Sequence, residues 1–252
     1  AYDGGISFGN RIERVLGWLE QPDETRPRMV TLYFNQPDGA GHSGGASGLA
    51  VDRAVADMDV TIGWLVQGLE QRGLLDRIHL LIVSDHGMAD TSPEKVIFLD
   101  EHVELDGVYA DNWGPWVPLR PPAGTEADFA AQLVDIPHAT CALAEDLPER
   151  LHYSGSDRIA PVHCIAEVGW SLTTRAWHEE HPLWHEGGTH GYDPADSEMH
   201  GILLARGPLL RRGVTIPPIE NVHLYGLMAH ILGVPPAPND GDAAVWKTLL
   251  TD

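Results

Sequence analysis

Residues 78–88 read IHLLIVSDHGM, and this stretch decides the fold class. Residues 78–84 form a near-continuous apolar run, which is typical of a parallel strand covered on both faces. An earlier apolar run, MVTLYFN at residues 29–35, predicts a second buried strand. Between the two, apolar residues recur at three- and four-residue steps, which predicts an amphipathic helix from about residue 47 to residue 73: Leu49, Val55, Met58, Ile62, Leu65 and Leu69. A strand–helix–strand unit of this kind indicates an α/β fold.

Regular patterns become rare over residues 91–186, which are rich in proline, tryptophan and histidine. Only residues 126–133 and 141–150 have helical patterns there, so we expect an irregular inserted subdomain. Regularity returns with a strand at residues 201–205 and a helix from Asn221, its expected N-cap, to Leu232, ended by Gly233. We therefore expect a mostly parallel central sheet flanked by helices, with about 91–186 inserted into it.

Composition narrows the possible classes of protein. The chain has 252 residues, of which 43% are hydrophobic, enough for a sizeable core. Its 37 acidic and 16 basic side chains give a formal net charge of −21, which argues against binding to a nucleic acid duplex. No apolar run approaches the roughly 18–20 residues of a membrane span. An anionic substrate would need local positive charge from a source other than lysine and arginine.

Two cysteines, Cys141 and Cys164, leave two possibilities open. They either form one disulfide, which would indicate an oxidising compartment (the periplasm or the extracellular space), or they are two buried thiols. No targeting peptide is visible at the N-terminus, and no initiating methionine is present there. The chain is therefore expected to be the later part of a longer polypeptide.

Acidic and imidazole side chains follow predicted strands in three places, where α/β folds hold ligands. Asp38 and His42 follow the first strand, Asp85 and His86 follow the second, and His190 lies in a third, glycine-rich loop. This donor set suits Zn²⁺ or Mn²⁺. Each site alone has an ordinary explanation, a surface turn for the first and a helix cap for the second. The three together favour a metal centre.

The motifs that carry these residues resemble those of a known family. They are FNQPDGAGH at residues 34–42, VSDHGM at 83–88 and GTHGYD at 188–193. In this order they are similar to the nucleotide pyrophosphatase/phosphodiesterase family, which belongs to the alkaline phosphatase superfamily of two-zinc hydrolases. The likeness runs along nearly the whole chain but is patchy over 91–186. It implies an alkaline-phosphatase-like α/β fold.

The resemblance implies a role for each of the five residues. Asp38, His42 and His190 match the ligands of one zinc, and Asp85 and His86 match two ligands of the other, with Mn²⁺ also compatible. The implied reaction is hydrolysis of a nucleotide phosphodiester or pyrophosphate bond through a threonine-linked intermediate, releasing a nucleoside 5′-monophosphate. The family's threonine and its remaining aspartate ligand match no position here. They are expected upstream, which makes residues 1–252 the C-terminal portion of one catalytic domain and its N-terminal part a partner.

Tyr2 resembles the family tyrosine that stacks on the nucleobase, a contact worth roughly 1–3 kcal/mol per base in nucleic-acid complexes. Two other functions stay open at this point. One is another hydrolase of the superfamily, acting on phosphomonoesters, sulfate esters or a lipid phosphodiester. The other is a catalytically dead module that binds a metal or ligand.

Overall fold

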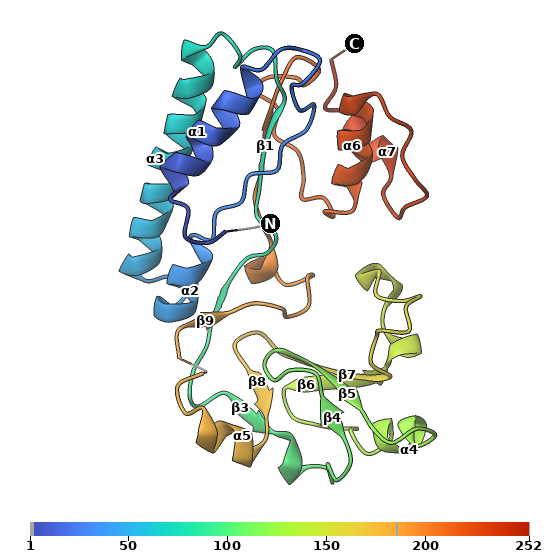
Figure 1. The fold of residues 1–252 in the computed structure, drawn as a ribbon. Coiled ribbons are helices and arrows are strands. Elements are labelled where there is room, and N and C mark those ends of the chain that lie inside the picture. The colour runs from blue at the N-terminus through green and yellow to red at the C-terminus, as the bar shows by residue number, and fades with distance from the viewer. Residues whose placement is uncertain (1–2, 185, 252) are drawn as a thin grey trace. The chain divides into compact units, whose positions relative to one another are not determined.

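The computed structural model describes residues 3–184 and 186–251 and divides into two compact units (Figure 1). Unit 1 contains the described residues up to 35, residues 56–83 and those from 202 onward. Unit 2 contains residues 36–55 and 84–201. Within the described residues, no helix is both long enough and apolar enough to cross a membrane.

Two helices of unit 1 pack closely because a glycine faces a leucine. Helix α1 (Phe8–Leu19) begins at Ser7, whose Oγ accepts a hydrogen bond from the backbone N–H of Asn10 at 3.3 Å. Helix α3 (Leu49–Gln71), predicted from its apolar steps, starts in unit 2 and continues into unit 1. A Cβ at Gly68 of α3 would lie 2.5 Å from Cδ1 of Leu16 of α1, so any larger residue at this position would force the leucine side chain to move.

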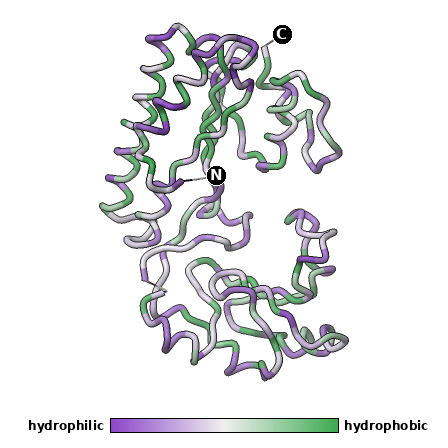
Figure 2. The backbone as a smooth tube through the Cα atoms, in the orientation of Figure 1, coloured by the Kyte–Doolittle hydropathy of each residue, from purple (hydrophilic) through white to green (hydrophobic). Residues whose placement is uncertain are grey.

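A two-stranded antiparallel ladder lies between two small cores of unit 1. Strand β1 (Leu80–Val83) pairs with β10 (Leu203–Arg206). Successive side chains of a strand point to opposite faces. Accordingly, Leu80 packs with the core of α1 and α3, and Leu81 packs with α6 (His223–Leu232) and α7 (Ala243–Lys247). The tube is green, or hydrophobic, along this ladder in Figure 2.

The expectation of a mostly parallel sheet needs correction within the described residues. Only β3 (Val96–Phe98) and β8 (Ser171–Thr173) pair in parallel, and residues 29–35 belong to no described ladder. Burial nevertheless alternates along residues 30–35, as in an extended segment with one covered face. The reason for the discrepancy is physical: an apolar run reports how deeply a segment is buried, but not the direction of its neighbour.

Unit 2 contains a regular sheet where sequence patterns indicated an irregular insertion. Four strands pair antiparallel in the order β4-β5-β7-β6. They are β4 (Tyr109–Ala110), β5 (Trp116–Arg120), β6 (Ala139–Leu143) and β7 (Val162–Ala166). The core of unit 2 includes the fully buried residues Leu99, Val117, Leu119, Val162, Cys164 and Leu172. Short helices α4 (Glu126–Ala130) and α5 (Arg175–Glu180) complete its secondary structure.

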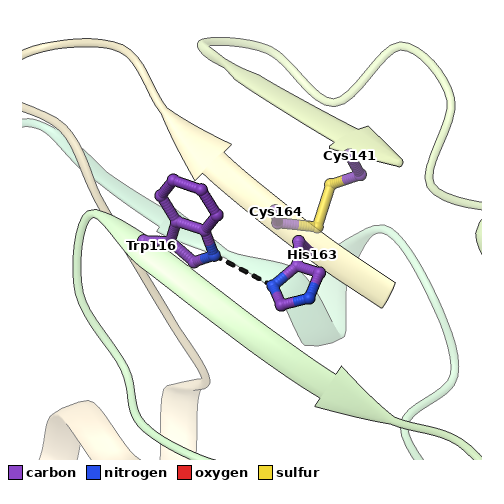
Figure 3. Close-up of a disulfide and its surroundings, with 4 residues drawn as sticks. All are labelled: Trp116, Cys141, His163 and Cys164. Atoms are coloured by element: carbon purple, nitrogen blue, oxygen red, sulfur yellow. Dashed lines mark hydrogen bonds between the residues drawn. A yellow bond between two sulfur atoms is a disulfide. The ribbon is translucent and has the colours of Figure 1, made fainter. Parts of the chain in front are cut away.

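The helix predicted over residues 141–150 is wrong. Residues 139–143 form β6, and two short 3₁₀ turns, Ala144–Asp146 and Glu149–Leu151, follow it. Cys141 lies directly opposite Cys164 of β7 in the ladder, and the two form a disulfide (Figure 3). Strand pairing and this covalent link override the local helical pattern.

The strand predicted at residues 201–205 is β10, which starts at Leu203. The helix expected from Asn221 is α6, which starts at His223 with Val222 at its N-cap. Gly233 ends it in the left-handed conformation (φ +66°), as predicted.

Candidate metal centre

Two candidate metal ligands, one aspartate and one histidine, lie about one turn apart on a short helix. The glycine-rich segment that follows residues 29–35 forms helix α2 (Asp38–Gly44). Residues four apart on a helix share a face, so Asp38 and His42 lie side by side, with 3.3 Å between Oδ1 and Nε2. Gly41 is buried against Met88, where an added Cβ would lie 2.9 Å from Cε. This packing holds α2 despite its low helix propensity.

The third candidate ligand, His190, lies near this pair in space but far from it in the sequence. It follows strand β9 (Gly188–Thr189), which pairs antiparallel with β2 (Ala89–Asp90). Its Nε2 lies 3.6 Å from Asp38 Oδ1. The candidate ligand atoms of Asp38, His42 and His190 all lie within 4.8 Å of one another. Among the described residues, they form the one group of three or more histidine, cysteine or acidic side chains close enough to hold a metal ion.

Asp85 and His86 approach the same place after β1. The ring of His86 is stacked on that of His190, and its Nε2 lies 3.9 Å from Asp38 Oδ1 and 3.6 Å from Asp85 Oδ1. The side chain of Asp85 is 77% exposed, whereas that of His86 is 24% exposed. A Cβ at Gly87 would lie 2.0 Å from the carbonyl oxygen of Glu198, so the glycine of this motif permits a close backbone approach.

Hydrogen bonds to backbone carbonyls orient two of the imidazoles. Nδ1 of His42 lies 2.9 Å from the carbonyl oxygen of Gly188, and Nδ1 of His86 lies 2.7 Å from that of Gly87. Since a carbonyl can only accept, each Nδ1 carries the proton in the neutral ring and each Nε2 presents a lone pair. Carbonyl partners of this kind are typical of histidines that bind metals.

The backbones of three segments pack closely against one another around these ligands. A Cβ at Gly187 would lie 2.1 Å from the carbonyl oxygen of His42, and one at Gly188 would lie 2.8 Å from that of Gly41. The Asp90 carboxylate accepts hydrogen bonds from Ala46 N–H and Ser47 Oγ, and so ties β2 to the turn after α2.

The cluster has the properties expected of a cation site. Burial lowers the pKa of His190, and the nearby rings of His86 and His42 lower it further, whereas the carboxylates of Asp38 and Asp85 oppose this shift. The net direction favours the neutral imidazole, which is the form that binds a metal ion. Asp38 Oδ1 is buried and accepts no hydrogen bond from any described residue, although three Nε2 atoms surround it. A divalent cation would satisfy this oxygen, and two histidines with one carboxylate are a donor set that suits zinc.

One predicted residue of the site has no described structure, and two features around the site were not predicted. Tyr2, expected to contact substrate, lies outside the described residues. The roles of Asp90 and of the Gly188 carbonyl were missed. A backbone acceptor leaves no signal in a sequence, and an isolated aspartate has many ordinary roles.

The comparisons with known proteins identify the family of this chain. The profile of the family "Type I phosphodiesterase / nucleotide pyrophosphatase" matches residues 1–193. The fold is that of an α/β protein of the alkaline-phosphatase-like class. The chain belongs to the nucleotide pyrophosphatase/phosphodiesterase family.

Relatives of known sequence are longer than this chain. An uncharacterised pyrophosphatase/phosphodiesterase of Schizosaccharomyces pombe is 32% identical over 256 residues, which cover 95% of this chain and 53% of the relative. The human bis(5′-adenosyl)-triphosphatase ENPP4 is 31% identical over 252 residues, covering 100% of this chain and 54% of the relative. The chain thus spans about half the length of these two relatives.

Solved structures match along the entire chain. Human ectonucleotide pyrophosphatase/phosphodiesterase 5 matches with a TM-score of 0.91 and 29% identity, covering 100% of this chain and 66% of that one. The murine protein of the same name matches with a TM-score of 0.89, 29% identity and the same coverage. That structure is of an inactive threonine-to-alanine variant in complex with AMP.

Proposed function

We propose that this chain carries the metal-binding part of a hydrolase that cleaves nucleotide phosphodiester or pyrophosphate bonds and releases a nucleoside 5′-monophosphate. The observation that carries the proposal is the buried, unpartnered Oδ1 of Asp38 facing the Nε2 atoms of His42, His86 and His190. Membership of the family supports it, as does the AMP bound to the murine relative.

Under this proposal the five side chains hold two divalent cations. Asp38, His42 and His190 would bind one ion, and Asp85 and His86 would bind the second together with a ligand from outside this chain. Zinc suits the donor set best, and Mn²⁺ is compatible with it. When bound, two such ions activate a hydroxyl nucleophile and stabilise the charge that develops on the phosphate.

Several features of this chain favour the binding of those ions. The carbonyls of Gly188 and Gly87 keep the Nδ1 protons of His42 and His86 away from the centre, so that both Nε2 lone pairs face it. The lowered pKa of His190 favours the neutral imidazole, the form that a metal ion binds. In a chain of net charge −21, the cations would also supply the positive charge that an anionic substrate requires.

The remaining parts of the catalytic site are proposed to come from outside the 252 residues. The inactivity of the threonine-to-alanine relative supports a threonine nucleophile, and this chain spans only about half of its longer relatives. We place the nucleophile, the remaining aspartate ligand and the N-terminal part of the same catalytic domain upstream of residue 1. Tyr2 is proposed to stack on the base of the nucleotide.

The Cys141–Cys164 disulfide supports a periplasmic or extracellular location, because disulfides persist in oxidising compartments.

A chelator experiment on the full-length polypeptide tests the proposed function. Hydrolysis of a chromogenic nucleotide diester should stop when a chelator is added and return with Zn²⁺ or Mn²⁺. The same protein should cleave the diester faster than the corresponding phosphomonoester. Turnover that continues in chelator would refute the metal-dependent reaction, and a preference for the monoester would refute the substrate class.

A further inference from the structure

The connection between β6 and β7 is long for two neighbouring antiparallel strands. Residues 144–161, called the brace here, leave the sheet at Leu143 and return at Val162. The Cys141–Cys164 disulfide joins the two strands near the base of the brace, and Cys164 is fully buried (Figure 3). The backbone closes the same base, since Ala144 N–H donates to the carbonyl oxygen of Pro161 at 2.9 Å.

Two further contacts hold the brace against the sheet. The ring of Tyr153 packs against Trp116 and His163, with both centroid distances at 5.4 Å. Those two rings are themselves joined by a hydrogen bond of 2.9 Å from Trp116 Nε1 to His163 Nδ1 (Figure 3). Farther along the brace, Arg120 Nη2 donates to the carbonyl oxygen of Arg158 at 2.7 Å. The brace is therefore anchored at its base and along its length.

From this anchored segment, one side chain reaches the loop that carries His190. The guanidinium of Arg150 makes a bidentate contact with the carboxylate of Asp193, with Nη1 2.6 Å from Oδ1 and Nη2 bonded to Oδ2. Asp193 Oδ1 also accepts a hydrogen bond of 2.9 Å from Ala195 N–H, which closes the turn after His190. Arg150 lowers the pKa of Asp193, which keeps the carboxylate ionised.

We propose that Arg150 is a positioning residue: through Asp193 it transmits the rigidity of the disulfide-closed brace to the loop that presents His190 to the cation site. The effect on metal affinity rests on the proposed function, whereas the effect on the loop does not. Exposed ion pairs add little to global stability, so the pair should act mainly on the position of the loop. Its bidentate geometry provides the orientation that such a role needs.

The test compares Arg150→Gln with Arg158→Gln in the full-length polypeptide. Both changes remove one positive charge from the brace, and the guanidinium of Arg158 makes no hydrogen bond or ion pair with the described residues. Hydrogen–deuterium exchange of the metal-free protein should show faster exchange of residues 188–195 in Arg150→Gln alone. Arg150→Lys should give an intermediate rate, because an ammonium cannot form the two parallel hydrogen bonds.

A second measurement follows Co²⁺ binding through its visible absorption. Arg150→Gln should weaken Co²⁺ binding by about 10-fold, the lower end of the effect of residues that orient metal ligands, and alter the ligand-field bands, while Arg158→Gln should match the wild type. Unchanged loop exchange in Arg150→Gln would overturn the inference, and so would faster exchange with unchanged Co²⁺ affinity. If the wild type itself bound no metal, the proposed function would fail, and loop exchange alone would then decide the role of Arg150.

Discussion

The imidazole rings of His86 and His190 are stacked, with centroids 3.4 Å apart and planes inclined by 12°. One ring follows β1 and the other follows β9, so the stack joins two of the three segments that carry candidate ligands. It brings both Nε2 atoms within 3.9 Å of Asp38 Oδ1. The stacked imidazole rings therefore connect the two proposed ion sites. A substitution of a ligand at one site should also alter metal binding at the other.

Replacing His190 tests the ligand cluster directly. In His190→Ala, Zn²⁺ affinity measured by isothermal titration should fall by at least about 100-fold, beyond the usual effect of outer contacts. The matched control is His102→Ala, which removes an exposed histidine whose ring makes no described contact. Equal affinities in the two variants would show that His190 does not bind the metal.

Gly187 should be irreplaceable because of a backbone contact. An alanine there would place its Cβ 2.1 Å from the carbonyl oxygen of His42 and displace that ligand, so metal affinity should fall. Gly124→Ala is the matched control, since Gly124 also has a positive φ (+86°, against +96° at Gly187) but nothing within 4 Å of the added atom. Gly124→Ala should cost about 1–2 kcal/mol of stability and leave metal affinity unchanged. Equal effects of the two alanines on metal binding would contradict the contact.

His163 should make the fold sensitive to acid. Its ring is fully buried, with Nδ1 accepting from Trp116 and Nε2 lying 2.8 Å from the carbonyl oxygen of Ala160, and burial lowers its pKa from 6.5. Below pH 6.5 the unfolded chain therefore gains a proton that the folded chain does not. The free energy of unfolding falls as pH drops through this range, by at most about 1.4 kcal/mol per pH unit for one group.

His163→Gln isolates that contribution. The variant should be less stable at pH 7.5 by roughly 1–3 kcal/mol, because Trp116 loses its acceptor. Between pH 6.5 and 5, its unfolding free energy, measured by urea titration, should fall less steeply than that of the wild type. Parallel pH profiles would mean that His163 is not held neutral by the fold.

The disulfide should contribute measurably to stability. Cys141 and Cys164 are 23 residues apart, and a loop of that length corresponds to roughly 3 kcal/mol in the chain-entropy description. The double variant Cys141→Ala with Cys164→Ala should lose about that much in urea unfolding, and reduction of the wild type should reproduce the loss. A loss below about 1 kcal/mol would contradict a structural role for the link.

Local patterns predicted the elements whose apolar residues follow a clear periodicity or a continuous run. The apolar steps of α3 and the apolar run of β1 are visible in a short window of sequence, and both elements occur within two residues of the expected bounds. The sheet of unit 2 was missed because its strands lie in a segment rich in proline, tryptophan and histidine, where no clear alternation or long continuous run of apolar residues marks them. Cys141 shows the limit well, because its strand conformation depends on Cys164, which no local window contains.

Part of the candidate site could likewise be predicted from the sequence, and part could not. Its acidic and imidazole residues could be selected from their motifs, because those residue types are chemically distinctive. The helical setting of Asp38 and His42 could not, since a glycine-rich segment has low helix propensity and α2 depends on packing against Met88. Neither the His86–His190 stack nor the Arg150–Asp193 contact has a signal in the sequence, because each joins distant segments through side chains with many ordinary partners.

Anomalous diffraction at the zinc absorption edge tests the central claim most directly. Crystals of the full-length protein grown with Zn²⁺ should show one peak among Asp38, His42 and His190 and a second beside Asp85 and His86. Well-ordered density for all five side chains without a peak between them would contradict the account.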